Sequence, residues 1–198
     1  MINKCTPGLV FAFFLIAPPV VSAGNPDKPE SNDHATKASM PRTPLAEILE
    51  SVSKKSGKKF LVEHRVQPSV VVGQARPKDV SYSSLLQILR NNGLAGVTID
   101  DVVNVVPVGT VRQYPLPVLF DDDPSIDGEE WVTRVIKLEN ARAPTLIPIM
   151  RPLLPQAGHM AAYPMSNTIL IVDRYANVRR VTEMISRIDS LTPAQPEK

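Results

Sequence analysis

The chain has 198 residues, of which 43% are hydrophobic and 21% are charged, and its formal net charge is +2. That length can hold one large domain or two small ones. The slight net charge gives no reason to expect nucleic acid or an acidic membrane surface as a partner. The twenty prolines gather in a few stretches, which favours two compact units with extended connections.

Residues 1–23 are predicted to be a secretory signal. Lys4 supplies a positive start, an apolar core follows, and a small-residue site predicts cleavage between Ala23 and Gly24. A retained membrane anchor is the alternative, but two consecutive prolines interrupt the apolar run before the roughly 20 residues that a bilayer span needs. Cys5, the only cysteine, would leave with the signal, so we expect neither a disulfide nor a thiol nucleophile in the exported chain.

Residues 24–42 are polar and lack periodicity, which predicts a flexible spacer. A compact unit, residues 43–108, follows. Its first helix has apolar residues at helical spacing, with Thr43 as the predicted N-cap and Gly57 at its end.

The remaining elements of this unit are predicted to be strands at 60–62 and 69–73, an amphipathic helix through 82–89, and a hairpin of strands 94–99 and 102–108. Either Ser81 or Asp79 is expected to cap the helix. The hairpin is expected to turn at Asp100 and Asp101.

Residues 109–130 are predicted to be an exposed linker, because the stretch combines prolines with six acidic residues in its last ten positions. A calcium loop is the alternative interpretation, since clustered carboxylates suit hard cations. The spacing is wrong for an EF-hand, in which glycine would occupy the position of Ile126.

A second module is predicted at residues 131–190, followed by a polar tail at 191–198. Its elements are expected to be a strand at 132–138, a short or kinked helix within 143–154, a hairpin of strands 159–163 and 168–172, and a closing amphipathic helix at 176–188. This βαββα order is KH-like. The predicted fold class is therefore α+β, with two small two-layer α/β modules joined by a Pro/Asp-rich linker.

The motifs of catalysis and metal binding are missing from the sequence. His34, His64 and His159 do not share the helical spacing of zinc ligands, and no serine lies in a Gly-x-Ser-x-Gly turn. The sequence Gly93-Leu94-Ala95-Gly96 matches the GxxG pattern of nucleic-acid-binding KH loops, but it carries no Lys or Arg. We therefore expect no enzyme, no cofactor, no metal, no small-molecule substrate and no nucleic-acid partner.

Three stretches of the second module resemble the repeated periplasmic module of secretins, the ring-forming outer-membrane channels of type II secretion: Met150–Pro155, AAYPMSNTILIVD (161–173) and ANVRRVTEMISRID (176–189). The VVVG of residues 70–73, NNGLAGV and VVNVVPV resemble the first N-terminal (STN-like) domain of the same proteins, which also occurs in TonB-dependent transducers. Secretins continue into a channel domain, and none is expected within these 198 residues.

The resemblance implies a non-catalytic periplasmic component of a type II-like secretion system, accessory to or derived from the secretin ring. The implied partners are a secretin or an inner-membrane secretion component, with possible self-association into a ring. A TonB-system adaptor and a remnant of a split secretin gene are the alternatives, and an exported enzyme would require a polar pocket that the sequence does not indicate.

Open strand edges of small sheets invite pairing with another chain. We therefore predict partner or ring contacts on the first module's second strand and on the second module's hairpin. The predicted contact residues are Val70, Val71, Val72, Tyr163, Asn167, Ile169 and Ile171.

Overall fold

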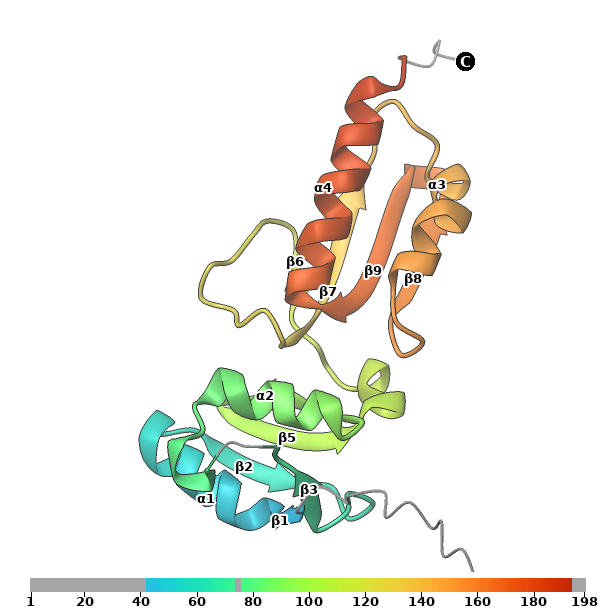
Figure 1. The fold of residues 1–198 in the computed structure, drawn as a ribbon. Helices are drawn as coiled ribbons and strands as arrows, with labels where there is room; N and C mark the ends of the chain where they lie inside the picture. The colour runs from blue at the N-terminus through green and yellow to red at the C-terminus, as the bar shows by residue number, and fades with distance from the viewer. Residues whose placement is uncertain (1–41, 74–75, 194–198) are drawn as a thin grey trace, which may run out of the picture. The chain divides into compact units, whose positions relative to one another are not determined.

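The computed structural model of the protein describes residues 42–73 and 76–193 (Figure 1). The predicted signal, with its cleavage site at Ala23 and Gly24, lies outside the described residues, as does the predicted spacer apart from Arg42. All described residues belong to one compact unit, Ser39–Lys198. Helices combine with short sheets of both parallel and antiparallel strands, so the predicted α+β class is confirmed. Among the described helices, none has the length and apolarity needed to cross a bilayer.

The first module consists of two small sheets that pack with two α-helices. Its elements are β1 (Arg42–Pro44), α1 (Leu45–Ser56), β2 (Lys59–Val62), β3 (Ser69–Val71), the 3-10 turn η1 (Pro77–Asp79), α2 (Tyr82–Asn91), β4 (Leu94–Ile99) and β5 (Val102–Pro107). Strands β1 and β3 pair antiparallel, whereas β5 lies between a parallel β2 and an antiparallel β4. The apolar faces of both helices share one core with residues of β3, β4 and β5.

Helix α1 forms where the sequence places Leu45, Ile48, Leu49 and Val52 on one face, and all four side chains are buried. Gly57 ends the helix in the left-handed conformation (φ +70°) and donates its N–H to the Ser53 carbonyl, as predicted.

The predicted N-cap of α1, Thr43, is wrong. Pro44 occupies the cap position without a side-chain hydrogen bond, and Thr43 instead pairs with Val70 in the β1–β3 ladder. The chain therefore enters the helix directly from a strand.

Two local predictions for the rest of this module are confirmed. Of the two candidate caps of α2, Ser81 fills the role, since its hydroxyl oxygen accepts the Ser84 N–H at 3.1 Å. The β4–β5 hairpin turns at Asp100 and Asp101, which both have positive φ (46° and 65°). Positive φ at both central residues matches the right-handed twist of a two-residue hairpin.

The second module carries two helices on a four-stranded sheet of order β6-β7-β9-β8. Its elements are β6 (Val118–Leu119), β7 (Trp131–Lys137), α3 (Ala143–Met150), the 3-10 turn η3 (Arg151–Leu153), β8 (His159–Tyr163), the turn η4 (Pro164–Ser166), β9 (Thr168–Arg174) and α4 (Tyr175–Leu191). Helix α4 packs on β7 and β9, and α3 packs beside β8 (Figure 1). The apolar side chains of α3, α4 and the sheet form a continuous core.

Prolines shorten α3 as predicted. One proline occupies the first turn, where its missing N–H costs nothing, and Pro148 lies inside the helix. The α-helix ends at Met150 and passes into a 3-10 turn that contains Pro152.

The stretch predicted to be an exposed linker, 109–130, is exposed or half-buried except at Val111, but it also contains secondary structure. The 3-10 helix η2 (Val108–Gln113) overlaps its start, and Val111 is fully buried beside β4, β5 and Trp131. Strand β6 then joins the second sheet by pairing parallel to β7. The acidic stretch is also anchored, because the Tyr175 hydroxyl accepts the Asp123 N–H at 2.7 Å.

Candidate interaction surfaces

The edge of β3 is closed by a side chain. The Asn92 carboxamide accepts the Val71 N–H at 2.9 Å and donates to the Val71 carbonyl at 2.9 Å, so it occupies the place that a neighbouring strand would take. Val70 is only 1% exposed and lies in the core between β3 and the helices. The structure therefore assigns Val70 to packing in place of the predicted partner contact, whereas Val71 and Val72 are half-buried.

The second predicted contact region also divides into buried and exposed residues. Strand β9 is paired on both sides, with β7 and with β8, so it is not an edge strand. Ile169 and Ile171 are fully buried in the core of the second module and pack there instead of facing a partner. Tyr163, at the end of edge strand β8, is 62% exposed and retains a side chain that a partner can reach.

Asn167 holds three segments of the second module together. It adopts the left-handed conformation (φ 51°) and its carboxamide oxygen accepts the Ala143 N–H at 2.8 Å. Its amide nitrogen donates to the carbonyls of Leu138 and Ala141 at 3.1 and 2.9 Å. These bonds fix the β7–α3 connection against the β8–β9 turn, so the structure assigns Asn167 to folding in place of the predicted partner contact.

Hydrogen bonds to Asp189 also fix the β7–α3 connection to α4. The Asp189 carboxylate accepts the N–H groups of Glu139, Asn140 and Ala141 at 2.7–2.9 Å. Burial opposes its ionisation, but the three backbone hydrogen bonds outweigh burial and lower the pKa of Asp189 from its ordinary value. The charged form is therefore the one that the fold stabilises.

A groove between α1 and β2, which has no counterpart in the sequence predictions, is a largely apolar concave surface of the first module. It has a volume of about 550 Å³, and its apolar lining comes from one face of α1, from alternate residues of β2 and from the loop after β2: Leu45, Ala46, Leu49, Phe60, Val62, Val66 and Pro68. Leu61 and Val62, both on β2, are 60% and 45% exposed. Large apolar side chains exposed beside such a groove are typical of a protein-binding surface.

Glu129, in the stretch 109–130 that the sequence predicts to be a linker, forms ion pairs with residues of both modules. The Glu129 carboxylate lies 3.0 Å from the Arg90 guanidinium and 3.3 Å from that of Arg174, which stacks at 5.0 Å over the Trp131 ring. Burial, followed by the charge of Arg90, lowers the pKa of Arg174. These contacts give the residues around Trp131 a structural role, since each charge has a partner within reach.

The described residues 42–73 and 76–193 contain no group of three or more His, Cys, Asp or Glu side chains that could hold a metal ion. Burial raises the pKa of the Asp173 carboxyl, which would suit a general acid. The Asp173 carboxylate instead accepts hydrogen bonds from the Asn177 side-chain amide at 2.5 Å and from the Arg174 N–H at 2.7 Å. The geometry favours structural use of this carboxyl over catalysis.

Comparison with known proteins shows similarity to secretins. Residues 133–193 match the family model of a bacterial type II/III secretion system short domain. The chain is 30% identical over 147 residues to secretin XcpQ of Pseudomonas aeruginosa, covering 73% of this chain and 21% of that protein. It is also 30% identical over 193 residues to secretin GspD 2 of Escherichia coli, covering 94% of this chain and 28% of that protein. The chain thus spans between a fifth and a third of the length of these relatives.

A solved assembly shares the fold. The Klebsiella pneumoniae type II secretion system outer membrane complex, which contains PulD, PulS and the PulC HR domain, matches with a TM-score of 0.61 and 28% sequence identity. The match covers 77% of this chain and 26% of that chain. It therefore extends beyond the 133–193 region into the first module.

Proposed function

We propose that this chain acts as a non-catalytic protein-binding component of a type II-like secretion system. The premise is its similarity to the N-terminal part of secretins. The observation that carries the proposal is the structural match to a chain of a secretion complex over 77% of this chain. A match of that extent includes both modules, so the proposal concerns their combined surface.

The site chemistry supports binding in preference to catalysis. Within the part of the chain that the structure describes, the carboxylates of Glu129, Asp173 and Asp189 are engaged in an ion pair or in hydrogen bonds that hold the fold together. The surfaces left open are apolar and lie at strand edges, as at Tyr163 and along β2. Strand edges and apolar grooves bind polypeptides.

We place the protein in the periplasm, exported by the predicted signal and associated with an outer-membrane secretin complex. The solved Klebsiella complex contains PulD together with PulS and the PulC HR domain. By analogy, a secretin or an inner-membrane secretion component is the proposed partner of this chain. Val71, Val72 and Tyr163 are the residues of the original prediction whose side chains remain available for such contacts.

Cross-linking in the native envelope tests the proposal. The tagged full chain is cross-linked in living cells, purified under denaturing conditions, and its partners are identified by mass spectrometry. We expect a secretin or an inner-membrane secretion component to be enriched over a tagged, unrelated periplasmic protein. Enrichment of TonB-system regulators without any secretion component would overturn the proposal and favour the transducer-type role of the first module.

A further inference from the structure

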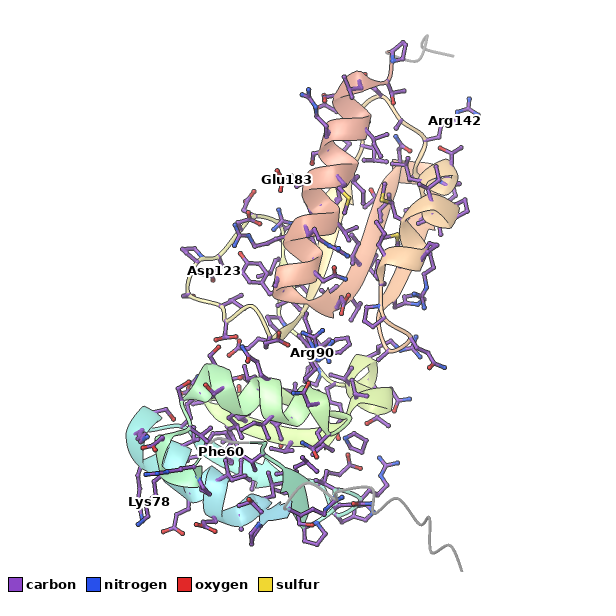
Figure 2. All side chains as sticks on the ribbon, in the orientation of Figure 1. Phe60, Lys78, Arg90, Asp123, Arg142 and Glu183 are labelled. Carbon is purple, nitrogen blue, oxygen red and sulfur yellow. The ribbon has the colours of Figure 1, made fainter. Side chains whose placement is uncertain are left out.

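A polar pocket lies against helix α4 in the second module. Its volume is about 630 Å³, which is enough for several side chains and far more than a single small ion occupies. The charged residues that line it come from α4, from β7 and from the acidic stretch: Asp122, Arg134, Arg179, Arg180 and Glu183. In Figure 2, Glu183 lies on the side of α4 that faces the loop carrying Asp123. Three guanidinium groups and two carboxylates give the pocket a positive net charge.

Arg134 is the buried member of this pocket. It is only 9% exposed and lies on the face of β7 whose other residues, Val132 and Ile136, belong to the core. Its Nη1 donates to the Asp122 carboxylate at 3.0 Å. Within residues 42–73 and 76–193, no group accepts a hydrogen bond from its buried Nε. A buried guanidinium with an unpaired donor is costly, so an acceptor at this nitrogen would stabilise the fold.

The unpaired Nε defines the edge of Arg134 that a ligand would use. In a guanidinium group, the N–H of Nε and one N–H of Nη2 point the same way, and together they bind a carboxylate through two parallel hydrogen bonds. Asp122 bonds to Nη1 and leaves this edge to another acceptor. Thr182 also lines the pocket, and its Oγ1 likewise has no partner among the described residues. A hydroxyl can donate to the same oxyanion.

The other two arginines add charge that a ligand can use. Arg179 lies 3.7 Å from the Asp122 carboxylate, so Arg134 and Arg179 share a single acid. Arg180 donates to two neutral acceptors, the Asn177 amide oxygen at 3.0 Å and the Leu153 carbonyl at 3.3 Å. The guanidinium charge of the pocket therefore complements an anionic ligand with more than one acidic group.

The acidic stretch of the chain indicates which kind of anion fits. Asp122 reaches the arginines from a peptide backbone that is held in place by the hydrogen bond from the Asp123 N–H to the Tyr175 hydroxyl. A polypeptide that carries aspartates thus already passes beside the pocket with a carboxylate on arginine. The Asp122 side chain is 57% exposed, and ion pairs at such positions are weak, so this contact leaves the pocket accessible.

We propose that the pocket binds an acidic segment of a partner polypeptide. One carboxylate of the segment binds the Nε edge of Arg134, and its neighbours pair with Arg179 and Arg180. The inference rests on the proposed function, polypeptide binding, and names the chemistry of one partner segment. Its test uses a synthetic peptide, so a negative result would remove this site and leave the outcome of the envelope cross-linking unaffected.

Fluorescence anisotropy of a labelled peptide measures the binding. The probe is a capped Gly-Asp-Asp-Asp-Gly peptide, titrated with the purified full chain at low salt. We expect saturable binding with a dissociation constant of about 100 μM or lower. Binding should weaken as salt rises to about 0.5 M, because exposed charges are then screened. The same peptide with asparagine in place of each aspartate should not bind.

Variants of the lining residues assign the binding to this pocket. Arg179→Gln removes one guanidinium, and Arg134→Lys keeps the charge but loses the planar pair of donors, so each should weaken binding about fivefold or more. Arg187→Gln is the matched control, since Arg187 is an exposed residue of α4 outside the pocket lining. Asp122→Asn keeps an acceptor for Nη1 and removes a competing negative charge, so it should tighten binding about fivefold.

Three results would overturn the inference: no binding at about 1 mM peptide, equal binding of the asparagine peptide, or a loss in Arg187→Gln as large as that in Arg179→Gln. Inorganic phosphate that competes as strongly as the peptide itself would identify an ion site without polypeptide recognition and would equally refute it. Circular dichroism establishes that each variant is folded. If Arg134→Lys does not fold, Arg179→Gln decides, because its side chain is 60% exposed.

Discussion

Replacing Asn167 by alanine should destabilise the protein strongly. The change removes three hydrogen bonds to the backbone of Leu138, Ala141 and Ala143, each of which contributes about 1 kcal/mol. Alanine also tolerates the left-handed conformation at φ 51° less well than asparagine, at a cost of about 1 kcal/mol. The free energy of unfolding should therefore fall by about 3–4 kcal/mol.

Urea unfolding followed by the fluorescence of Trp131 measures this loss. Trp131 is the only tryptophan of the chain and is buried, so its emission should shift on unfolding. Asn167→Gly separates the two contributions, because glycine accepts the left-handed conformation and loses only the hydrogen bonds. We expect the glycine variant to be more stable than the alanine variant by about 1 kcal/mol. An alanine variant within about 0.5 kcal/mol of wild type would refute the reasoning, since a surface residue without a structural role gives such values.

Three further changes should act through packing and charge. Asp189→Asn should lower the free energy of unfolding by about 1–2 kcal/mol at neutral pH, through weaker acceptance of three N–H groups. Because the native pKa of Asp189 is lowered, its stabilisation is present above the unfolded pKa of about 3.9 and is lost as pH falls toward the native value, where variant and wild type should converge. Gly96→Ala should cost about 1–3 kcal/mol in thermal unfolding, since the new Cβ would lie 2.8 Å from a leucine methyl. Glu129→Gln should lower the melting temperature, because two arginines lose their shared carboxylate.

Matched variants distinguish these effects from general sensitivity. Gly109→Ala adds the same methyl group where no atom lies within 4 Å, and Glu183→Gln removes the same charge from the exposed face of α4 (Figure 2). Both should stay within about 0.5 kcal/mol of wild type. If Gly109→Ala were as harmful as Gly96→Ala, or Glu183→Gln as harmful as Glu129→Gln, the local explanations would fail. A stability difference at Asp189 that persisted unchanged to pH 2 would contradict the carboxylate argument.

Local patterns in the sequence predicted the elements of both modules well. The helical spacing of Leu45, Ile48, Leu49 and Val52 identified the buried face of α1, because a single periodic stripe suffices to bury a helix. The sequence predicts Thr43 as a cap because β1 has only three residues and no alternation that would reveal a strand. The pairing of β1 with β3 depends on a partner more than 20 residues away, which local reasoning does not see.

The interaction surface was harder to predict than the elements. The prediction of partner contacts at Ile169 and Ile171 rests on an open strand edge, but strand apolarity reports burial and does not say whether a strand is central or at an edge. Local patterns do not reveal how the acidic stretch is anchored, because the cations that pair with Glu129, Arg90 and Arg174, lie 39 and 45 positions away from it. The groove beside α1 has no sequence signature, since it results from the packing of a helix against one strand.

A direct binding measurement tests the central proposal most directly. The purified full chain is titrated by calorimetry with the periplasmic regions of the secretin and of the inner-membrane secretion components from the same organism. The account predicts saturable binding to at least one of them with a dissociation constant of about 1 μM, corresponding to about −8 kcal/mol, as is typical of a modest protein–protein contact. No binding to any of them at a hundredfold higher concentration, about 100 μM, would contradict a role in secretion-system assembly.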